Sequence, residues 1–535
     1  MIRPITLLVL IAATVPFAGM CEVRPAALFS DNMVIQRETQ APVWGFADAG
    51  EAVTVRASWG ASASTTADQD GNWMVKLKTP SAGGPHTMTI QGNNTIEIAN
   101  VLSGEVWFCP GQSNMEFKMS QLARNIPRRT AERDKPAALY IKNEIETAED
   151  YLLRQFTVTK NTSPLEPFDT LTGSWILSSP EANGEFSATA YFFGRELRER
   201  LDVPVALIAS AWGGTRVEAW MPAEVFEQDQ EMAAYYESKM AELRGQLEQW
   251  DDAKVAANYQ EKLKKWEAGG KKRRKPKPAR HPTGNQDLPA TLFNAMVTPV
   301  IPYAIKGAIW YQGEANAKHN THKYEANFRG MIRAWREHWG QGDFPFYFAQ
   351  LAAWQEPTQK PVESNKWVSI CDQQRRALGL NNTGMAVLSD IGEASDIHPH
   401  NKMDVGKRLA LWALKNDYQQ ALPVCSGPLY KSHTINGNQV VITFDSVGSG
   451  LMSGVKPVIG DTTPSSGPLK HFQICGADRK WKWAEADITG KDQVTVSHPE
   501  VNAPTVVRYA WAQNASSANL YNKEGLPASI FTTEE

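Results

Sequence analysis

The sequence contains little cysteine for its length. Of its 535 residues only five are cysteines, and none lies in a Cys-x-x-Cys pair or near histidines at the spacing of zinc ligands. No structural metal site is therefore expected. Cys109 and Cys371 lie within or beside apolar runs, which predicts buried thiols, whereas Cys425 and Cys475 could pair in an oxidising compartment.

The sequence also lacks an excess of charge of either sign. Its 55 lysines and arginines nearly balance its 58 aspartates and glutamates, which leaves a net charge of −3. This balance gives no overall reason to expect nucleic acid or an anionic membrane as a partner. Apolar residues make up 42% and charged residues 21%, as in ordinary globular proteins, and the length is enough for two or three domains.

Long hydrophobic runs are absent beyond the N-terminus. Residues 1–20 hold Arg3, an apolar run over 5–15, and then Pro16 and small residues. This pattern predicts a secretory signal peptide, because the run is too short for a membrane span and polar sequence follows it. A lipid anchor on Cys21 is not expected, since Met20 replaces the small residue that normally precedes a lipidated cysteine. We expect a secreted or periplasmic protein without a membrane span.

Both ends of the remaining chain show the alternation of β-strands. In residues 22–102, period-two runs such as 53–57 and 73–77 are separated by glycine-rich turns, which predicts an N-terminal β-sandwich domain. In residues 421–535, Asn-Gly and Thr-Gly turn signals precede further period-two runs. A C-terminal β domain is therefore predicted there.

Residues 103–420 instead alternate apolar strands with helical stretches. Repeated β-α units of this kind predict an α/β fold with a parallel sheet and helices on both faces. A charged insertion at about 222–282 has helical spacing and predicts a hairpin of two helices. It ends in a basic run at 271–280, which is either a solvated linker or a contact for an acidic glycan or partner. The expected strands are 105–109, 205–209, 307–311, 346–349 and 385–388, and the expected helices are 191–201, 324–339, 366–378 and 403–414.

Polar, glycine-containing segments follow four of these strands. Gly111-Gln112-Ser113-Asn114-Met115 follows the first strand, where its serine is either a nucleophile or the cap of a following helix. Ligands of parallel sheets bind outside the carboxyl ends of the strands, so one rim is expected to gather a hydroxyl, an imidazole, carboxylates and hydrogen-bond donors. These groups suit acyl transfer. The other three segments are 212–215, 312–314 and 389–399.

Several longer segments resemble one known family. They are GQSNMEF at 111–117, ASAWGGTRVEAWMP at 209–222, LFNAMVTPVIPYAIKGAIWYQGEANA at 292–317, SDIHPHNKMDVGKRLA at 395–410 and VRYAWAQNASSANLYNKEGLPASIF at 507–531. On these segments the chain resembles the sialate O-acetylesterase family of the SGNH (GDSL-like) hydrolase superfamily. The resemblance implies an SGNH-type α/β/α esterase core flanked by β domains, an O-acetylated carbohydrate substrate, and no metal or organic cofactor.

The resemblance also implies roles for individual residues. Ser113 resembles the family's nucleophile and His398 its general base. The N–H groups of Ser113 and Gly214 and the side-chain amide of Gln312 resemble the donors of the oxyanion hole. Asp396 is the expected partner of the histidine.

The spacing of the acid departs from the superfamily pattern. The common pattern is Asp-x-x-His, whereas here one residue separates Asp396 from His398, and Ser395 occupies the common aspartate position. Residues two apart in an extended segment point the same way, so contact between the two is feasible. Glu393, Asp390 or a main-chain carbonyl are the alternatives.

Three hypotheses of function follow. The first is an exported sialate-type carbohydrate O-acetylesterase that works through an acetyl-serine intermediate. The second keeps this mechanism but acts on acetylated xylan or another polysaccharide, and the third is a non-catalytic glycan-binding protein on an esterase fold. Arg216 could bind the carboxylate of a sialate, or it could form a structural ion pair. The sequence does not determine the sugar, the acetyl position or the oligomeric state.

Overall fold

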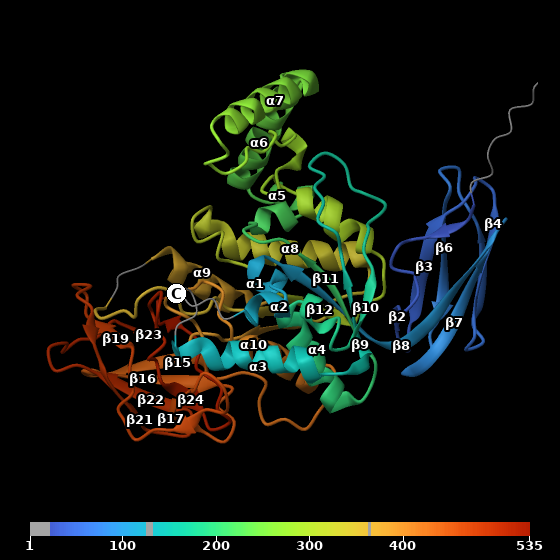
Figure 1. Ribbon diagram of the computed structural model, residues 1–535. Coiled ribbons are helices and arrows are strands. Elements are labelled where there is room, and N and C mark those ends of the chain that lie inside the picture. Colours follow the sequence, from blue (N-terminus) through green and yellow to red (C-terminus); the bar gives the residue numbers. More distant parts are fainter. Residues whose placement is uncertain (1–21, 125–131, 362–364, 535) are drawn as a thin grey trace, which may run out of the picture.

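The computed structural model describes residues 22–124, 132–361 and 365–534 (Figure 1). The expected signal peptide at 1–20, together with Cys21, lies outside the described residues. Between the two flanking β regions lies a layered core, and a pair of helices projects from it, as Figure 1 shows. The SGNH-type α/β/α class predicted from the sequence, with a β region on each side of the core, is confirmed.

One long strand, β8 (Thr95–Gly111), connects the N-terminal region to the core. Its first part pairs with β7 (Gly83–Gln91) and β2 (Val34–Gln36), and its last part pairs with β11 (Val205–Ala211) and β12 (Gly307–Trp310). The sequence predicts two separate strands here, at 95–98 and 105–109. They are continuous because the residues between them also find backbone partners on β2 and β7. The expected domain boundary at 102/103 thus falls inside a strand.

The core sheet is mixed, with strand order β10-β9-β11-β8-β12-β13-β14. All neighbours from β9 to β14 are parallel, and β10 is an antiparallel edge strand. The strands β9 and β10 were not predicted from the sequence. The bounds not yet given are β9 (Asp150–Thr157), β10 (Trp175–Ser178), β13 (Phe346–Ala349) and β14 (Thr383–Ala386).

Helices cover both faces of this sheet. Alternate residues of β8 point to opposite faces: Trp107 packs on Phe193 of α4 with ring centroids 5.0 Å apart, and Phe108 packs on Trp339 of α8 at 5.4 Å. Both side chains are fully buried, which explains the unbroken apolar run in this strand. Figure 1 shows α8 on one side of the sheet and α3, α4 and α10 on the other. The helix bounds are α3 (Lys135–Thr147), α4 (Ala188–Leu201), α8 (Tyr324–Trp339), α9 (Lys366–Ala377) and α10 (Lys402–Asn416).

The order of the strands creates a crevice at the end of β8. The chain first builds the side of the sheet that holds β9, β10 and β11, and it then crosses to β12 on the other side of β8. At such a switch of direction the connections leave opposite faces, so the carboxyl ends of β8, β11 and β12 enclose a space between their loops. Three of the four predicted polar segments follow these three strands.

Two β regions flank the core. In the N-terminal region one sheet holds β1, β3 and β6, and β4, β5 and β7 join β8 in a second sheet. The C-terminal region contains three small sheets, and its first hairpin turns at Gly437 with φ +63°, as its Asn-Gly signal predicts. The N-terminal bounds are β1 (Arg24–Pro25), β3 (Gln40–Phe46), β4 (Ala52–Ala57), β5 (Ser62–Thr66) and β6 (Asn72–Lys78). The C-terminal bounds are β15 (Leu429–Asn436), β16 (Gln439–Asp445), β17 (Leu451–Val455), β18 (Thr463–Pro464), β19 (Phe472–Cys475), β20 (Lys482–Trp483), β21 (Glu485–Ile488), β22 (Gln493–Ser497), β23 (Val506–Tyr509), β24 (Leu520–Asn522) and β25 (Phe531–Thr532).

The predicted helical hairpin is present as α6 (Gln230–Glu248) and α7 (Asp252–Ala268), which project from the core beyond the short α5 (Ala223–Phe226) (Figure 1). Each long helix begins at an aspartate that accepts a hydrogen bond from the backbone N–H three residues on, at Met232 and Lys254. Helix α6 buries side chains against the core, whereas α7 buries none.

The four described cysteines are all free thiols. Cys109 and Cys371 are buried free thiols, as expected. The suggested disulfide between Cys425 and Cys475 is wrong, because both are free thiols. Cys475 is enclosed in β19, where it pairs with Val506 of β23, while Cys425 lies in the segment between α10 and β15.

No described helix combines the length and apolar character that a bilayer crossing requires. Within the same residues, no group of three or more histidine, cysteine or carboxylate side chains is arranged to hold a metal ion.

Candidate active site

Ser113 begins the short helix α1 (Ser113–Glu116), immediately after β8. The turn requires glycine at Gly111, where φ is +152° and a Cβ atom would lie 2.4 Å from the Tyr311 carbonyl oxygen. The next backbone N–H, from Gln112, donates to that same oxygen at 3.0 Å. The end of β12 therefore fixes the turn and leaves Ser113 half-buried at its tip.

His398 contacts Ser113 from the loop between β14 and α10. Its Nε2 atom lies 2.9 Å from Ser113 Oγ, and its Nδ1 atom lies 2.9 Å from Asp396 Oδ1. The ring of Phe117 packs on the imidazole, with centroids 4.4 Å apart. Hydroxyl, imidazole and carboxylate thus form one hydrogen-bonded series, although the serine and the histidine are 285 residues apart in the chain.

The one-residue spacing of Asp396 and His398 is compatible with contact because the loop folds back on itself. Asp396 Oδ1 accepts the backbone N–H of His398 at 2.9 Å in addition to the ring contact. Burial alone would raise the pKa of this carboxyl, but the hydrogen bonds from the His398 side chain and backbone outweigh burial and hold the pKa below its usual value. Asp396 therefore stays ionised next to the imidazole.

The alternative carboxylates have other partners. Glu393 accepts hydrogen bonds from His400, whose Nδ1 lies 2.8 Å from Glu393 Oε1. Asp390 is bound by both terminal nitrogens of Arg408, at 2.6 and 2.8 Å. Both carboxylates are buried in these pairs. The geometry thus brings Asp396, and neither of the other two, to His398.

Two backbone N–H groups next to Ser113 lack a partner. In the described part of the chain, neither the N–H of Ser113 nor that of Gly214 donates to a backbone oxygen. Gly213 brings this loop against the serine, since a Cβ atom on Gly213 would lie 3.2 Å from Ser113 Cβ. Gly214 is exposed and has φ +80°, and a Cβ atom there would meet no other atom within 4 Å. Unoccupied donors at this place suit a developing oxyanion.

The structure places Gln312 behind the site and not at the cavity. Its Nε2 group donates to Thr215 O at 3.1 Å and to Asn316 Oδ1 at 2.7 Å, which uses both amide hydrogens. Its Oε1 accepts from the Tyr324 hydroxyl at 3.2 Å, and the side chain is fully buried. The predicted oxyanion donor therefore connects the loop of Thr215, its own loop and the start of α8, and it has no hydrogen left to donate.

A cavity of about 820 Å³ opens above Ser113 and His398. Part of its lining is aromatic: the rings of Trp354 and Trp367 pack together, with centroids 5.2 Å apart. Arg216 also lines it, and its guanidinium is loosely paired with Asp287, with Nε 3.9 Å from Oδ1. Flat apolar walls with a few polar groups suit a sugar carrying a small acyl group.

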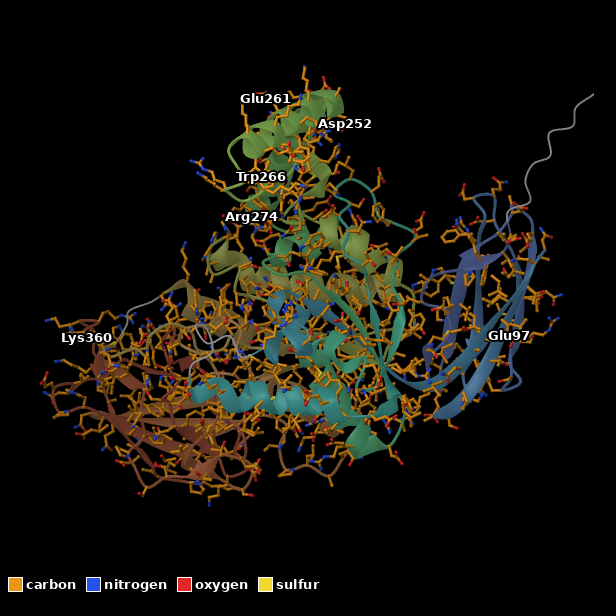
Figure 2. The ribbon with its side chains drawn as sticks, viewed as in Figure 1. Glu97, Asp252, Glu261, Trp266, Arg274 and Lys360 are labelled. Carbon is orange, nitrogen blue, oxygen red and sulfur yellow. The ribbon has the colours of Figure 1, made fainter. Side chains whose placement is uncertain are left out.

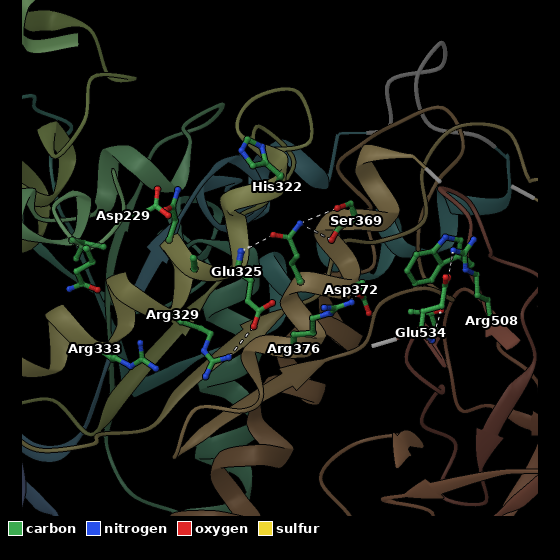
Figure 3. A pocket seen from close by; sticks show the side chains of 17 residues that line it. Asp229, His322, Glu325, Arg329, Arg333, Ser369, Asp372, Arg376, Arg508 and Glu534 are labelled. Atoms are coloured by element: carbon green, nitrogen blue, oxygen red, sulfur yellow. Dashed lines mark hydrogen bonds and ion pairs between the residues drawn. The ribbon is translucent and has the colours of Figure 1, made fainter. Parts of the chain in front are cut away.

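A second cavity, of about 780 Å³, shares no lining residue with the first (Figure 3). It lies between α8, α9 and the edge of the C-terminal β region. Three of its four arginines face carboxylates: Arg329 pairs with Glu325, Arg376 with Asp372 and Arg508 with Glu534. Because most of these charges neutralise one another, this cavity is not a second candidate for the chemistry.

Sequence patterns did not indicate a buried polar cluster beneath the site. Asn114 donates to Glu314 Oε1 at 2.5 Å and to the Ile397 carbonyl at 3.1 Å, and its Oδ1 accepts from Lys402 Nζ at 2.6 Å. Asn114, which follows Ser113 in the chain, is therefore bonded to Ile397, which precedes His398. One signal was available: Lys402 is the first residue of α10, where the helix dipole disfavours a cation.

Burial controls the charges in this cluster. It raises the pKa of Glu314, although the hydrogen bond from Asn114 opposes the shift, and Glu314 Oε2 has no hydrogen-bond partner among the described residues. Burial also lowers the pKa of Lys402 to about 8, against the attraction of Glu314, Glu393 and Asp396. Burial thus disfavours the charged forms of both Glu314 and Lys402 beneath Ser113.

A serine, a histidine and an aspartate joined by hydrogen bonds at the carboxyl edge of a parallel sheet, with free backbone donors beside the serine, define the class of serine-dependent α/β hydrolases. Comparison with known proteins agrees with this class. The sequence pattern of the family described as carbohydrate esterase, sialic acid-specific acetylesterase, matches residues 103–273 and 289–415. The chain belongs to this family, and it is an esterase.

Individual relatives match nearly the whole chain. Sialate O-acetylesterase of Rattus norvegicus is 29% identical over 99% of this chain and 98% of its own, and that of Homo sapiens is 28% identical over 91% and 87%. The crystal structure of a carbohydrate acetylesterase from Xanthomonas citri is similar with a TM-score of 0.76 and 34% identity, and covers 96% of this chain and 99% of its own.

Proposed function

We propose that the protein is an exported carbohydrate O-acetylesterase in which Ser113 carries the acetyl group between two half-reactions. The observation that supports this most directly is the 2.9 Å contact between His398 Nε2 and Ser113 Oγ, with Asp396 2.9 Å from the other ring nitrogen. A serine hydroxyl is a weak nucleophile until a neighbouring base accepts its proton, and this geometry supplies that base.

In the first half-reaction Ser113 Oγ attacks the carbonyl carbon of the acetyl ester, and its proton moves to His398 Nε2. The carbonyl oxygen becomes an oxyanion that accepts from the N–H groups of Ser113 and Gly214. As the carbonyl re-forms, the bond to the sugar oxygen breaks, and His398 returns its proton to that oxygen. The sugar leaves with a free hydroxyl, and the acetyl group remains on Ser113.

In the second half-reaction water takes the place of the sugar. His398 accepts a proton from the water as its oxygen attacks the acetyl carbon, and the same two N–H groups bind the second oxyanion. Collapse releases acetate and returns the proton to Ser113 Oγ. The carboxylate of Asp396 stabilises the imidazolium in both half-reactions and does not itself take the proton.

A sialate-type substrate is the proposal for the sugar. The family description names sialic acid, and the relatives above are sialate O-acetylesterases. Arg216 lines the cavity and is only loosely held by Asp287, so its guanidinium can donate hydrogen bonds to a substrate carboxylate. Export is proposed from the hydrophobic N-terminal residues 1–20, and N-terminal sequencing of the protein recovered outside the cytoplasm tests it.

The catalytic proposal is tested with Ser113→Ala and a panel of acetylated sugars that includes O-acetylated sialate and acetylated xylan. We expect the wild type to release acetate from O-acetylated sialate faster than from xylan. We expect the variant to fold, to fall to near background, and to resist labelling by an organophosphonate that labels Ser113 of the wild type. A wild type that binds the sugars without releasing acetate would instead indicate a glycan-binding protein, and preferential release from xylan would change the sugar.

A further inference from the structure

The basic segment, residues 271–280, concentrates charge to an unusual degree. Seven of its ten residues are lysine or arginine, and no acidic residue occurs between Glu267 and Asp287. The whole chain carries −3, so the segment carries +7 while the other 525 residues together carry −10. Such a local excess is a strong electrostatic feature of an otherwise acidic molecule.

The two ends of the basic segment are anchored on the helical hairpin, which a solvated linker would not require. At the first end Trp266 Nε1 donates to the Arg273 carbonyl at 2.5 Å, and Lys271 Nζ lies 5.6 Å from the centre of the Trp266 ring. At the other end the ring of His281 meets that of Trp250, with centroids 5.1 Å apart. Figure 2 shows Trp266 and Arg274 together on the flank of the hairpin.

The cations of the basic segment are exposed and have no ion-pair partner within the described residues. Several acids of the hairpin instead pair with nearby cations of the hairpin itself, as in Glu261 with Lys265, Glu242 with Lys239 and Asp251 with Lys254. Ten extended residues span at most about 33 Å, so the seven cations follow one another at intervals of about 5 Å. This interval is shorter than the screening length of about 8 Å in physiological salt, so their fields add.

The basic segment also leads directly to the catalytic cavity. After Arg280, the chain reaches Asp287, a residue of the cavity wall that also contains Ser113, within at most about 24 Å of extended chain. The family match is interrupted between 273 and 289, which includes most of this segment. Most of the basic segment therefore lies outside the stretches that match the family, on the chain that leads to the cavity wall.

We propose that the basic segment binds a polyanionic glycan, a polysaccharide with repeated carboxylate groups, and presents its acetylated residues to the catalytic cavity. Arginine and lysine are the side chains that pair with carboxylates, and a row of them matches a polymer better than a single sugar. The inference rests on the proposed function, because it takes the polymer to be the substrate whose ester Ser113 cleaves.

The test measures binding without catalysis. Unacetylated polygalacturonate is titrated into Ser113→Ala protein, and the same background carries Lys272→Gln, Arg273→Gln, Arg274→Gln and Lys275→Gln together. The matched control replaces four exposed lysines elsewhere, Lys76, Lys78, Lys480 and Lys491, by glutamine. We expect the basic-segment variant to bind at least tenfold more weakly and the control to stay within twofold. The affinity of the parent protein should fall steeply between 50 and 300 mM salt.

Four outcomes overturn the proposal: no binding of polygalacturonate, unchanged binding by the folded basic-segment variant, equal losses in both fourfold variants, or tighter binding of single-stranded DNA or phosphatidylserine vesicles than of polygalacturonate. Circular dichroism checks folding. If the fourfold variant fails to fold, Arg274→Gln with Lys275→Gln replaces it, and an affinity loss under threefold counts against the proposal. Absence of acetate release by the wild type would refute the proposed function while leaving the binding result intact.

Discussion

His398 uses each ring nitrogen for a different partner, so the two contacts can be separated by mutation. We predict that Asp396→Asn lowers kcat by about 10²–10⁴-fold, because the imidazole loses the carboxylate that fixes its tautomer and stabilises its charged form. His398→Ala should abolish turnover, because no base remains for Ser113. The measurement is kcat with a p-nitrophenyl acetate substrate.

Two further variants serve as controls for the acid. Glu393→Gln and Asp390→Asn remove carboxylates that pair with His400 and Arg408, so they should lower stability more than kcat. If Asp396→Asn were nearly silent while one of these variants lost turnover in folded protein, the acid would be reassigned. If all three were silent, Ser113 and His398 would form a dyad.

Gln312 gives a prediction in which stability and catalysis diverge. Gln312→Ala leaves Thr215 O, Asn316 Oδ1 and the Tyr324 hydroxyl with one partner fewer each. An unsatisfied buried polar group costs about 1–3 kcal/mol, so we expect the free energy of unfolding in urea to fall by at least that amount. A variant of unchanged stability whose kcat fell about 10²–10³-fold would instead restore Gln312 as an oxyanion donor.

At the scale of elements, the carboxyl group of Asp134 is buried at the start of α3, where its charged form is disfavoured. Burial and the nearby Glu393 raise the pKa of Asp134 to about 6, although Arg133 and His400 oppose the shift. In the unfolded chain the pKa of this carboxyl is near 3.8. At a pH between 3.8 and about 6, folding therefore takes up a proton. The folded state consequently loses stability relative to the unfolded state as the pH rises through about 6.

We therefore predict that Asp134→Asn is more stable than the wild type at pH 7.5, by about 1–2 kcal/mol, and that the difference shrinks at pH 4.5. Urea unfolding at the two pH values measures it. Glu132→Gln, at an exposed acid of the same turn, is the control and should show no such pH dependence. An Asp134→Asn difference that is constant with pH would contradict the pKa shift.

Elements with a clear apolar period were predictable from the sequence, and elements built around buried charge were not. Helix α8 has the predicted bounds because its apolar stripe faces the sheet along its length. Strand β9 was missed because it contains Arg154, whose buried guanidinium donates hydrogen bonds to acceptors that include the carbonyls of Asn32 and Asn100 in the N-terminal region. No local pattern shows that such distant acceptors exist.

The same distinction applies to the site. Ser113, Gly214 and His398 were expected near one another because neighbouring parallel strands end at the same edge, and the structure brings them together. The orientation of Gln312 and the cluster of Asn114, Glu314 and Lys402 depend on how loops from different strands meet. The spacing of residues within one segment cannot supply that information.

At the scale of the whole molecule, β8 makes the N-terminal region a part of the core. Glu105 is buried in this strand, where Gln36 donates to it at 3.1 Å and Arg37 at 2.5 Å. We predict that a chain starting at residue 103 is insoluble or strongly destabilised, since it leaves this carboxylate buried and unpaired. The comparison is with residues 22–535, by solubility and thermal unfolding. A soluble 103–535 fragment with full activity would show that the core folds alone.

Ser113 and His398 are 285 positions apart, which also fixes the order in which the two are made. A ribosome adds about 5–20 residues per second, so the proposed nucleophile precedes its proposed base by about 15–60 seconds of synthesis. During that interval Ser113 has no His398 imidazole to accept its proton. The proposed pair can therefore assemble only when the last quarter of the polypeptide emerges.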